Sequence, residues 1–106
     1  MRKYNNKITV VDNIRFQSKK EAERYVILKA MARSNLIGDL RLQVPFILSP
    51  SVVIGGRKRP ALRYFADFVY TKDGKQIIED VKGKITEGYR IKRHLMAVMG
   101  LAILET

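Results

Sequence analysis

The chain has 106 residues, 46% of them hydrophobic, which suits one domain over residues 1–106 and excludes a catalytic domain joined to a separate binding domain. Its 21 Lys and Arg outnumber ten Asp and Glu, leaving a net charge of +11. That charge indicates a nucleic-acid partner, because cations that neutralise phosphates release condensed counterions; a solvated basic surface or acidic lipid is the weaker alternative.

Cysteine is absent, which excludes disulfides, thiolate metal sites and a cysteine nucleophile. The N-terminal residues 1–6 are polar and lack the apolar core of a signal peptide. No apolar run approaches the roughly 20 residues that span a bilayer. We therefore expect a cytoplasmic protein with no membrane partner.

The first half of the chain predicts a hairpin, a helix and an edge strand. Residues 8–11 and 14–16 are expected to pair around Asp12-Asn13, since both residues tolerate tight-turn conformations. Residues 18–34, rich in Ala, Glu, Lys, Leu and Met, predict a helix. Residues 40–48 look extended, and Pro45 within them indicates an edge position or a bend.

The second half predicts a basic loop, a second hairpin, a helix and a final strand. The loop is residues 51–60, and strands at 62–70 and 76–81 flank Asp73-Gly74, a strong hairpin signal. A helix over 88–99 should present an apolar stripe, and residues 101–104 a last strand. The stripe consists of Ile91, Leu95, Val98 and Met99. The order helix, three strands, helix, strand predicts a mixed α/β (α+β) fold with a central mixed sheet flanked by helices.

The second hairpin makes a geometric prediction. Counting back from the Asp73-Gly74 turn, Asp67 falls directly opposite Asp80, with Cβ atoms roughly 4.5–5.5 Å apart. Lys82 shares that face and Glu79 points to the other, because side chains alternate along a strand. A β-bulge in the hairpin would shift this register by one residue.

Two opposed aspartates repel each other and need a compensating charge. Asp67 lies in a largely apolar segment, which predicts a central strand where an unpaired carboxylate is costly. A divalent cation would compensate, and Mg²⁺ prefers carboxylate oxygens. The structural alternative is an ion pair between Asp67 and Lys82 or an arginine.

Glu21 is the third acidic candidate, and two interpretations of it stay open. On a helix that begins after Ser18, Glu21 lies on the same side as Tyr25 and Leu28, so it could face the sheet. The segment Ser18-Lys19-Lys20-Glu21 also fits a capping box, which needs no chemistry. Glu23 is the weaker alternative.

These residues resemble the PD-(D/E)XK nuclease superfamily and its restriction-endonuclease-like core, and look closest to small phage-encoded proteins. The resemblance covers most of the chain and rests on residues 16–25 (FQSKKEAERY), 64–68 (YFADF) and 79–83 (EDVKG). An acid on the first helix, an Asp and an acid-x-Lys match Glu21, Asp67, Asp80 and Lys82. Ala66 departs from the Pro of many members, and Asp80 from the commoner Glu; strand parity favours Asp80 over Glu79.

The resemblance implies a metal-dependent DNA endonuclease that hydrolyses phosphodiester bonds, in the manner of a phage Holliday-junction resolvase in DNA recombination. It implies Mg²⁺, with Mn²⁺ as a substitute, held by Asp67, Asp80, Glu21 and the carbonyl of Val81. Lys82 would orient the attacking water or stabilise charge on the phosphate. A homodimer would suit paired cuts, in the host cytoplasm if the protein is phage-encoded.

Basic residues supply the expected DNA surface, although a solvated basic face is the alternative for each group. Arg90, Lys92 and Arg93 open the second helix, where cations oppose the helix dipole but suit phosphate. The basic loop and the residue after Gly83 add further candidates, namely Arg57, Lys58, Arg59 and Lys84. His94 is not expected to act as a base. A non-catalytic DNA-binding module and an RNA-directed protein are the competing functions.

Overall fold

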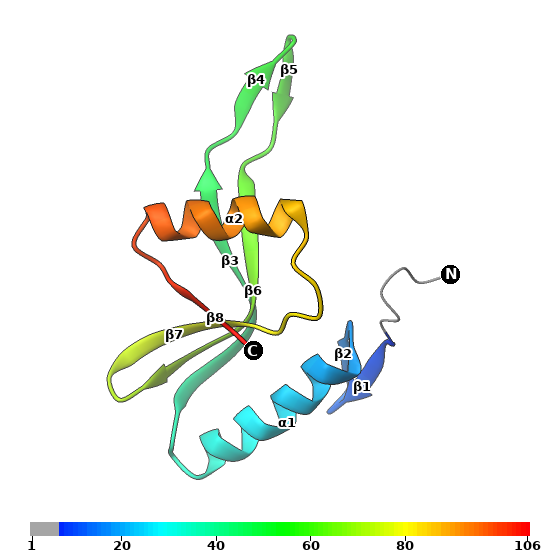
Figure 1. Ribbon diagram of the computed structural model, residues 1–106, viewed down its shortest axis with the longest axis vertical. Helices are drawn as coiled ribbons and strands as arrows, with labels where there is room; N and C mark the ends of the chain where they lie inside the picture. The colour runs from blue at the N-terminus through cyan, green and yellow to red at the C-terminus, as the bar shows by residue number, and fades with distance from the viewer. Residues whose placement is uncertain (1–6) are drawn as a thin grey trace.

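The computed structural model describes residues 7–106, so the polar N-terminal residues 1–6 lie outside the described residues (Figure 1). Two helices and eight strands follow one another along the described chain. They are β1 (Thr9–Val11), β2 (Ile14–Phe16), α1 (Lys19–Arg33), β3 (Gly38–Ser49), β4 (Val52–Ile54), β5 (Arg57–Arg59), β6 (Leu62–Lys72), β7 (Lys75–Asp80), α2 (Glu87–Val98) and β8 (Ile103–Glu105). Neither helix of this part of the chain is long and apolar enough to cross a membrane.

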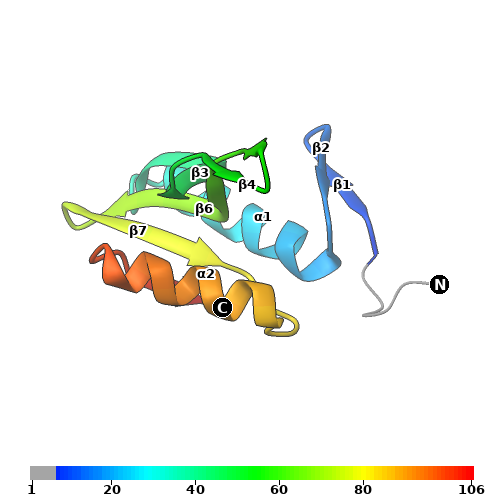
Figure 2. The same cartoon turned by 90° about the horizontal axis from the view of Figure 1, so that it is seen from above.

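The fold is α+β, as the order of predicted elements indicates, with a four-stranded mixed sheet in the order β3-β6-β7-β8. Neighbouring strands are antiparallel except β7 and β8, which are parallel. The helices lie on opposite sides of the sheet (Figure 2). One core cluster joins Tyr25 and Leu28 of α1 to Phe68, and the other joins Tyr89 and Met96 of α2 to the opposite face.

Both predicted hairpins are confirmed, and each turns on two residues with positive φ. These residues are Asp12 (53°), Asn13 (63°), Asp73 (51°) and Gly74 (76°). Two successive positive φ angles define the type I′ turn, whose twist matches that of the flanking strands. The β6–β7 ladder then runs without a shift from Lys72 opposite Lys75 to Phe68 opposite Glu79, so the expected register holds as far as Phe68, the residue that follows Asp67 in the sequence.

The strand β3 lies at the edge of the sheet, as Pro45 indicates, because proline has no backbone N–H to donate to a neighbouring strand. The expected basic loop over residues 51–60 is wrong: β4 and β5 pair there as a hairpin around Gly55-Gly56, with φ of 58° and 77°. The β-branched segment Val52–Ile54 and the two glycines are the signals that favour strands. This hairpin extends the β3–β6 ladder away from the rest of the molecule (Figure 1).

The helices begin and end within a residue or two of the predicted bounds, but the expected apolar stripe of α2 is wrong. Ile91, Val98 and Met99 are 47%, 72% and 44% exposed, whereas Tyr89 and Met96 are buried. The stripe of aliphatic residues has helical spacing, yet the larger side chains of Tyr89 and Met96 face the sheet. The second helix therefore leaves an apolar stripe in solvent.

Candidate active site

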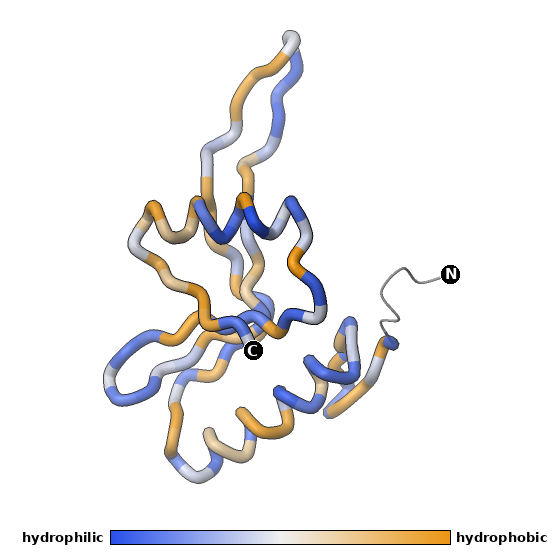
Figure 3. The backbone as a smooth tube through the Cα atoms, in the orientation of Figure 1, coloured by the Kyte–Doolittle hydropathy of each residue, from blue (hydrophilic) through white to orange (hydrophobic). Residues whose placement is uncertain are grey.

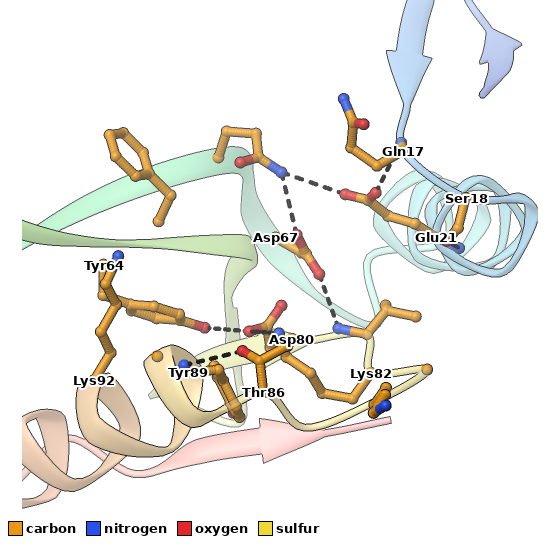
Figure 4. Close-up of a pocket in the computed structure, with 16 residues that line it drawn as sticks. Gln17, Ser18, Glu21, Tyr64, Asp67, Asp80, Lys82, Thr86, Tyr89 and Lys92 are labelled. Atoms are coloured by element: carbon orange, nitrogen blue, oxygen red, sulfur yellow. Dashed lines mark hydrogen bonds and ion pairs between the residues drawn. The ribbon is translucent and has the colours of Figure 1, made fainter. Parts of the chain in front are cut away.

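A pocket of about 890 Å³ opens between the first turn of α1, strands β6 and β7, and the first turns of α2 (Figure 4). The residues that line it come from segments far apart in the sequence. They include seven residues that the sequence singles out, namely Glu21, Asp67, Asp80, Val81, Lys82, Lys84 and Lys92.

Asp67 and Asp80 lie side by side at the end of the β6–β7 ladder. The side chain of Asp67 accepts a hydrogen bond from the backbone N–H of Val81 at 2.9 Å, which holds the two strands together beyond the last paired residues. Burial raises the pKa of Asp67, and nearby Glu21 raises it further. Burial, and then the carboxylate of Asp67, raises the pKa of Asp80 to about 7.

Lys82 and Tyr64 both contact the same oxygen of Asp80. The ammonium of Lys82 lies 3.0 Å from Oδ2, and the hydroxyl of Tyr64 donates to Oδ2 at 2.9 Å. Lys82 also lies over the ring of Tyr89, 3.8 Å from its centroid. Lys82 therefore forms its ion pair with Asp80, and not with Asp67 as the structural alternative expected. The pKa of Asp80 is still raised, because one ammonium does not compensate the crowded carboxylates.

Glu21 lies at the start of α1 and also in the pocket. Ser18 is the capping residue, since its Oγ accepts from the backbone N–H of Glu21. Oε1 of Glu21 accepts from the backbone N–H of Gln17 at 3.2 Å, one residue before the N–H that a capping box uses. Its Oε2 accepts from the side chain of Gln43 and lies in the pocket. Glu23 is exposed and pairs with Lys19, outside the pocket.

Gln43 is a site residue that sequence reasoning missed. Its side-chain amide donates to Glu21 at 3.3 Å and to Asp67 at 3.2 Å, so it joins α1 to the sheet. Gln43 has a positive φ of 50°, an uncommon conformation for a residue with a side chain. Its place opposite Asp67 follows from the β3–β6 register, which no local pattern reveals.

The strands β3 and β6 exchange faces where Gln43 and Asp67 lie. On one side of this point Leu42 and Phe68 pack in the core against α1, and on the other Val44 and Ala66 pack against α2. A strictly alternating strand would keep these even-numbered residues on one face. The change of face brings Tyr64 to the same pocket as Asp80, which explains why Tyr64 was also missed.

Glu79 points away from the pocket, as strand parity predicts. It is fully buried, and Arg24 makes two hydrogen bonds to it, the shorter one 2.6 Å. The hydroxyls of Tyr70 and Thr106 donate to it as well, at 2.6 and 3.0 Å. Although burial alone would raise it, these partners hold the pKa of Glu79 below its ordinary value.

The predicted DNA-binding residues fall into three groups. Lys84 and Lys92 line the pocket. Arg90 and Arg93 do not line it: Arg90 pairs with Glu87 in the first turn of α2, and Arg93 pairs with Glu105 of β8 at 3.0 Å. Three residues, Arg57, Lys58 and Arg59, are exposed on β5, in the hairpin that projects beyond the sheet.

The pocket offers oxygen ligands for a hard cation. Within residues 7–106, no group of three or more His, Cys, Asp and Glu side chains is arranged to hold a metal ion. Mg²⁺ usually needs fewer, because it keeps several waters and binds one or two carboxylates. Asp67 and Asp80 supply two carboxylates, and Val81 lines the same pocket. These donors fit Mg²⁺ or Mn²⁺ rather than a softer metal.

Comparisons with known proteins place the chain in a family. Residues 1–100 match the family described as "Protein of unknown function (DUF1064)". The chain belongs to the DUF1064 family. No curated protein sequence matches it. A crystal structure of protein VC1899 from Vibrio cholerae is similar at a TM-score of 0.40 and 17% identity over 92% of this chain, which spans 35% of that protein.

Proposed function

We propose that the protein is a Mg²⁺-dependent DNA endonuclease with the restriction-endonuclease-like core of the PD-(D/E)XK superfamily. The observation that carries the proposal is that Asp67 and Asp80 lie together in one pocket beside Lys82, with the pKa of both carboxyl groups raised, first of all by burial. A pocket that holds both carboxylates and lysines, in a strongly basic chain, is well suited to a cation bound between protein and phosphate. The order of Glu21, Asp67, Asp80 and Lys82, which resembles the superfamily pattern, supports the same conclusion.

The residues of the pocket have separate roles in this proposal. A bound Mg²⁺ would polarise the scissile phosphate and lower the pKa of a water nucleophile. Asp67 and Asp80 hold the cation, and Tyr64 orients Asp80 through its hydrogen bond. Lys82 places an ammonium beside them, where it stabilises the charge that develops on the phosphate oxygens.

Glu21 and Gln43 set the width of the pocket. Because Gln43 donates to both Glu21 and Asp67, it holds the first turn of α1 at a constant distance from the sheet. Glu21 lines the pocket with Asp67 and Asp80, and because it is only 6% exposed its side chain has little freedom to move. We propose that Glu21 accepts hydrogen bonds from cation-bound water or binds the cation itself.

DNA is the proposed substrate, bound through its backbone. Lys84 and Lys92 lie at the pocket, where they would contact phosphates on either side of the scissile bond. The projecting hairpin has a hydrophobic strand, β4, and a hydrophilic one, β5 (Figure 3). The basic side chains of β5 (Arg57–Arg59) would contact DNA phosphates outside the pocket.

The decisive experiment measures cleavage of matched four-way, flap, single-stranded and linear DNAs with Mg²⁺, with Mn²⁺ and with chelator. Wild type should cut with either metal, while Asp67→Asn, Asp80→Asn and Lys82→Ala should each lose at least about 100-fold, since metal and charge stabilisation contribute several kcal/mol. Glu23→Gln is the matched control, because Glu23 is exposed outside the pocket. Normal cutting by Asp80→Asn would contradict the proposal. Preference for the four-way DNA would identify a junction resolvase.

A non-catalytic DNA-binding module is the second candidate. The observation that favours it is that Tyr64 and Lys82 already satisfy one oxygen of Asp80. Tight, salt-sensitive DNA binding by wild type, with no cutting in either metal, would favour this function over the nuclease.

We propose that two copies act together and meet through the exposed stripe of α2. Paired cuts in branched DNA need two active sites, and Val98 and Met99 leave apolar surface in solvent. Val98→Asp should convert a dimer to a monomer in sedimentation velocity, while Ile27→Asp, a change at an exposed residue of α1, should not. A wild-type monomer on DNA would contradict this part of the proposal.

Such a nuclease would act in the cytoplasm, where DNA is accessible.

A further inference from the structure

Phe65 is an exposed aromatic residue on the wall of the candidate active site. It is 49% exposed, although an aromatic side chain buried in a core removes roughly 150–250 Å² from water. It lines the same pocket as Asp67 and Lys92, and it precedes Asp67 by two residues on β6. Two strand residues span about 7 Å, so the ring lies within one nucleotide of a phosphate held at the carboxylates.

The surface around Phe65 is apolar and uncovered. Pro45 lies directly opposite Phe65 on β3, and Ile47, two residues farther along, is 61% exposed. Alternation places these three side chains on the face opposite Tyr64, which packs in the core beneath α2. Arg63, opposite Ile47, is exposed on this face as well.

We infer that Phe65 is a stacking platform for an unpaired DNA base beside the scissile phosphate. The inference rests on the proposed function and names the substrate class: DNA with an unpaired nucleotide at the cut site. Bases stack on aromatic rings irrespective of their identity, and Arg63, exposed on the same face two residues before Phe65, can contact the backbone of the same nucleotide. A base in an intact duplex is already stacked on both sides, so it cannot use this ring.

A base fits this surface better than a second copy of the chain does. A stable interface buries about 800 Å² on each partner, several times what Phe65, Pro45 and Ile47 can offer. A second copy at this surface would also bring Arg63 close to its own counterpart, whereas DNA brings opposite charge. Phe65 also lines the pocket in which the proposed DNA substrate would bind.

The test compares binding of a single-stranded thymidine oligonucleotide with an abasic oligonucleotide of equal length, by fluorescence anisotropy in chelator. Phe65→Ala and Phe65→Leu should weaken binding of the thymidine strand about 5- to 100-fold and leave the abasic strand within about twofold. Phe65→Tyr should restore binding, because it keeps the ring. Ile27→Ala, a change at an exposed residue of α1 outside the pocket, is the control.

Three outcomes would overturn the inference: no loss with Phe65→Leu, an equal loss on both strands, or a dimer that Phe65→Ala converts to a monomer. Melting followed by circular dichroism checks that each variant is folded, and the leucine variant keeps the apolar volume. Because binding is measured without metal, its result stays separate from the cleavage assay. Absence of cutting by wild type would remove the nuclease and leave the stacking result intact.

Discussion

Glu79 and Asp80 are neighbours on β7, and their surroundings are opposite. Glu79 receives hydrogen bonds from Arg24, Tyr70 and Thr106, and its pKa is lowered. Asp80 faces a second carboxylate, and its pKa is raised to about 7. A carboxylate with full compensation stabilises a fold, while one without it is poised to take up a cation or a proton.

The two faces of β7 have different roles. Arg24 lies one turn after Glu21 on α1, so its bond to Glu79 ties the helix to the strand that carries Asp80. The backbone of Thr106 adds to this, since it bonds to Asp80 and Lys82 on either side of Val81. The contacts on the Glu79 side of β7 therefore fix the position of the strand that carries Asp80 on its other side.

The largest effect on stability is expected from loss of the ion pair between Arg24 and Glu79. Arg24→Ala should lower the free energy of unfolding by about 3–5 kcal/mol, because it leaves the buried charge of Glu79 without its cation. Urea denaturation of wild type and the variant measures the change. Lys19→Ala is the control, since its ion pair with Glu23 is exposed and should matter little. A change below about 1 kcal/mol for Arg24→Ala would show that the two faces do not differ as described.

A cation bound at Asp67 and Asp80 should stabilise the folded protein. Mg²⁺ or Mn²⁺ at about 100 times its dissociation constant should add about 2.7 kcal/mol to wild type, because it binds the folded state alone. Thermal melting with and without metal measures this, and Asp67→Asn or Asp80→Asn should abolish the shift. The Glu79→Gln protein should still respond to metal; equal loss of response there would place the cation elsewhere.

The pH dependence of the free energy of unfolding, measured on metal-free protein, should distinguish Asp80 from Glu79. Between pH 5 and 8 the folded state holds the proton of Asp80 up to about pH 7, whereas the unfolded chain has already lost it. Stability that comes from this group is fully present below the unfolded pKa of 3.8 and is lost as pH rises through the folded pKa; more than about 1 kcal/mol of this loss falls between pH 5 and 8. Asp67 has the same sign.

The group with a lowered pKa behaves in the opposite way. Glu79 contributes stability that is present above its unfolded pKa, near 4.5, and lost as pH falls below it, outside the window of pH 5–8. Urea denaturation at pH 5 and pH 8 in chelator should therefore show a smaller pH dependence for Asp80→Asn than for wild type. Identical pH dependence in the two proteins would mean that Asp80 is ionised throughout.

The smallest effect on the fold is expected from the projecting hairpin. Replacing Arg57, Lys58 and Arg59 together by Ala should leave the melting temperature unchanged, because all three are exposed. DNA affinity should fall, and the slope of log affinity against log salt should decrease by about 0.9 for each duplex phosphate that the variant no longer neutralises. A slope equal to that of wild type would show that the hairpin does not touch DNA.

Short-range rules were sufficient for part of the fold and of the site. The type I′ turn at Asp73-Gly74 sets the β6–β7 register, and strand alternation then separates Glu79 from Asp80. The capping residues Ser18 and Glu21 mark the start of α1 within one residue. The same rules applied to Gly55-Gly56 would have predicted the hairpin β4–β5.

Other features depend on packing between distant segments. The predicted stripe on α2 was wrong because helical spacing gives two candidate faces, and only packing against the sheet chooses Tyr89 and Met96 over Val98. The pair Arg24 and Glu79 lies 55 residues apart in sequence, and no local pattern joins them.

The sequence alone predicted that Asp67, Asp80 and Lys82 lie together, because a two-residue turn and a period of two are local properties of the chain, and all three line one pocket. Tertiary structure alone decided that Gln43, Tyr64 and Glu21 meet them there. That meeting requires β3 and β6 to exchange faces at Asp67 and α1 to dock at one position. Both are outcomes of packing the whole core, in which many weak interactions between distant segments are satisfied together.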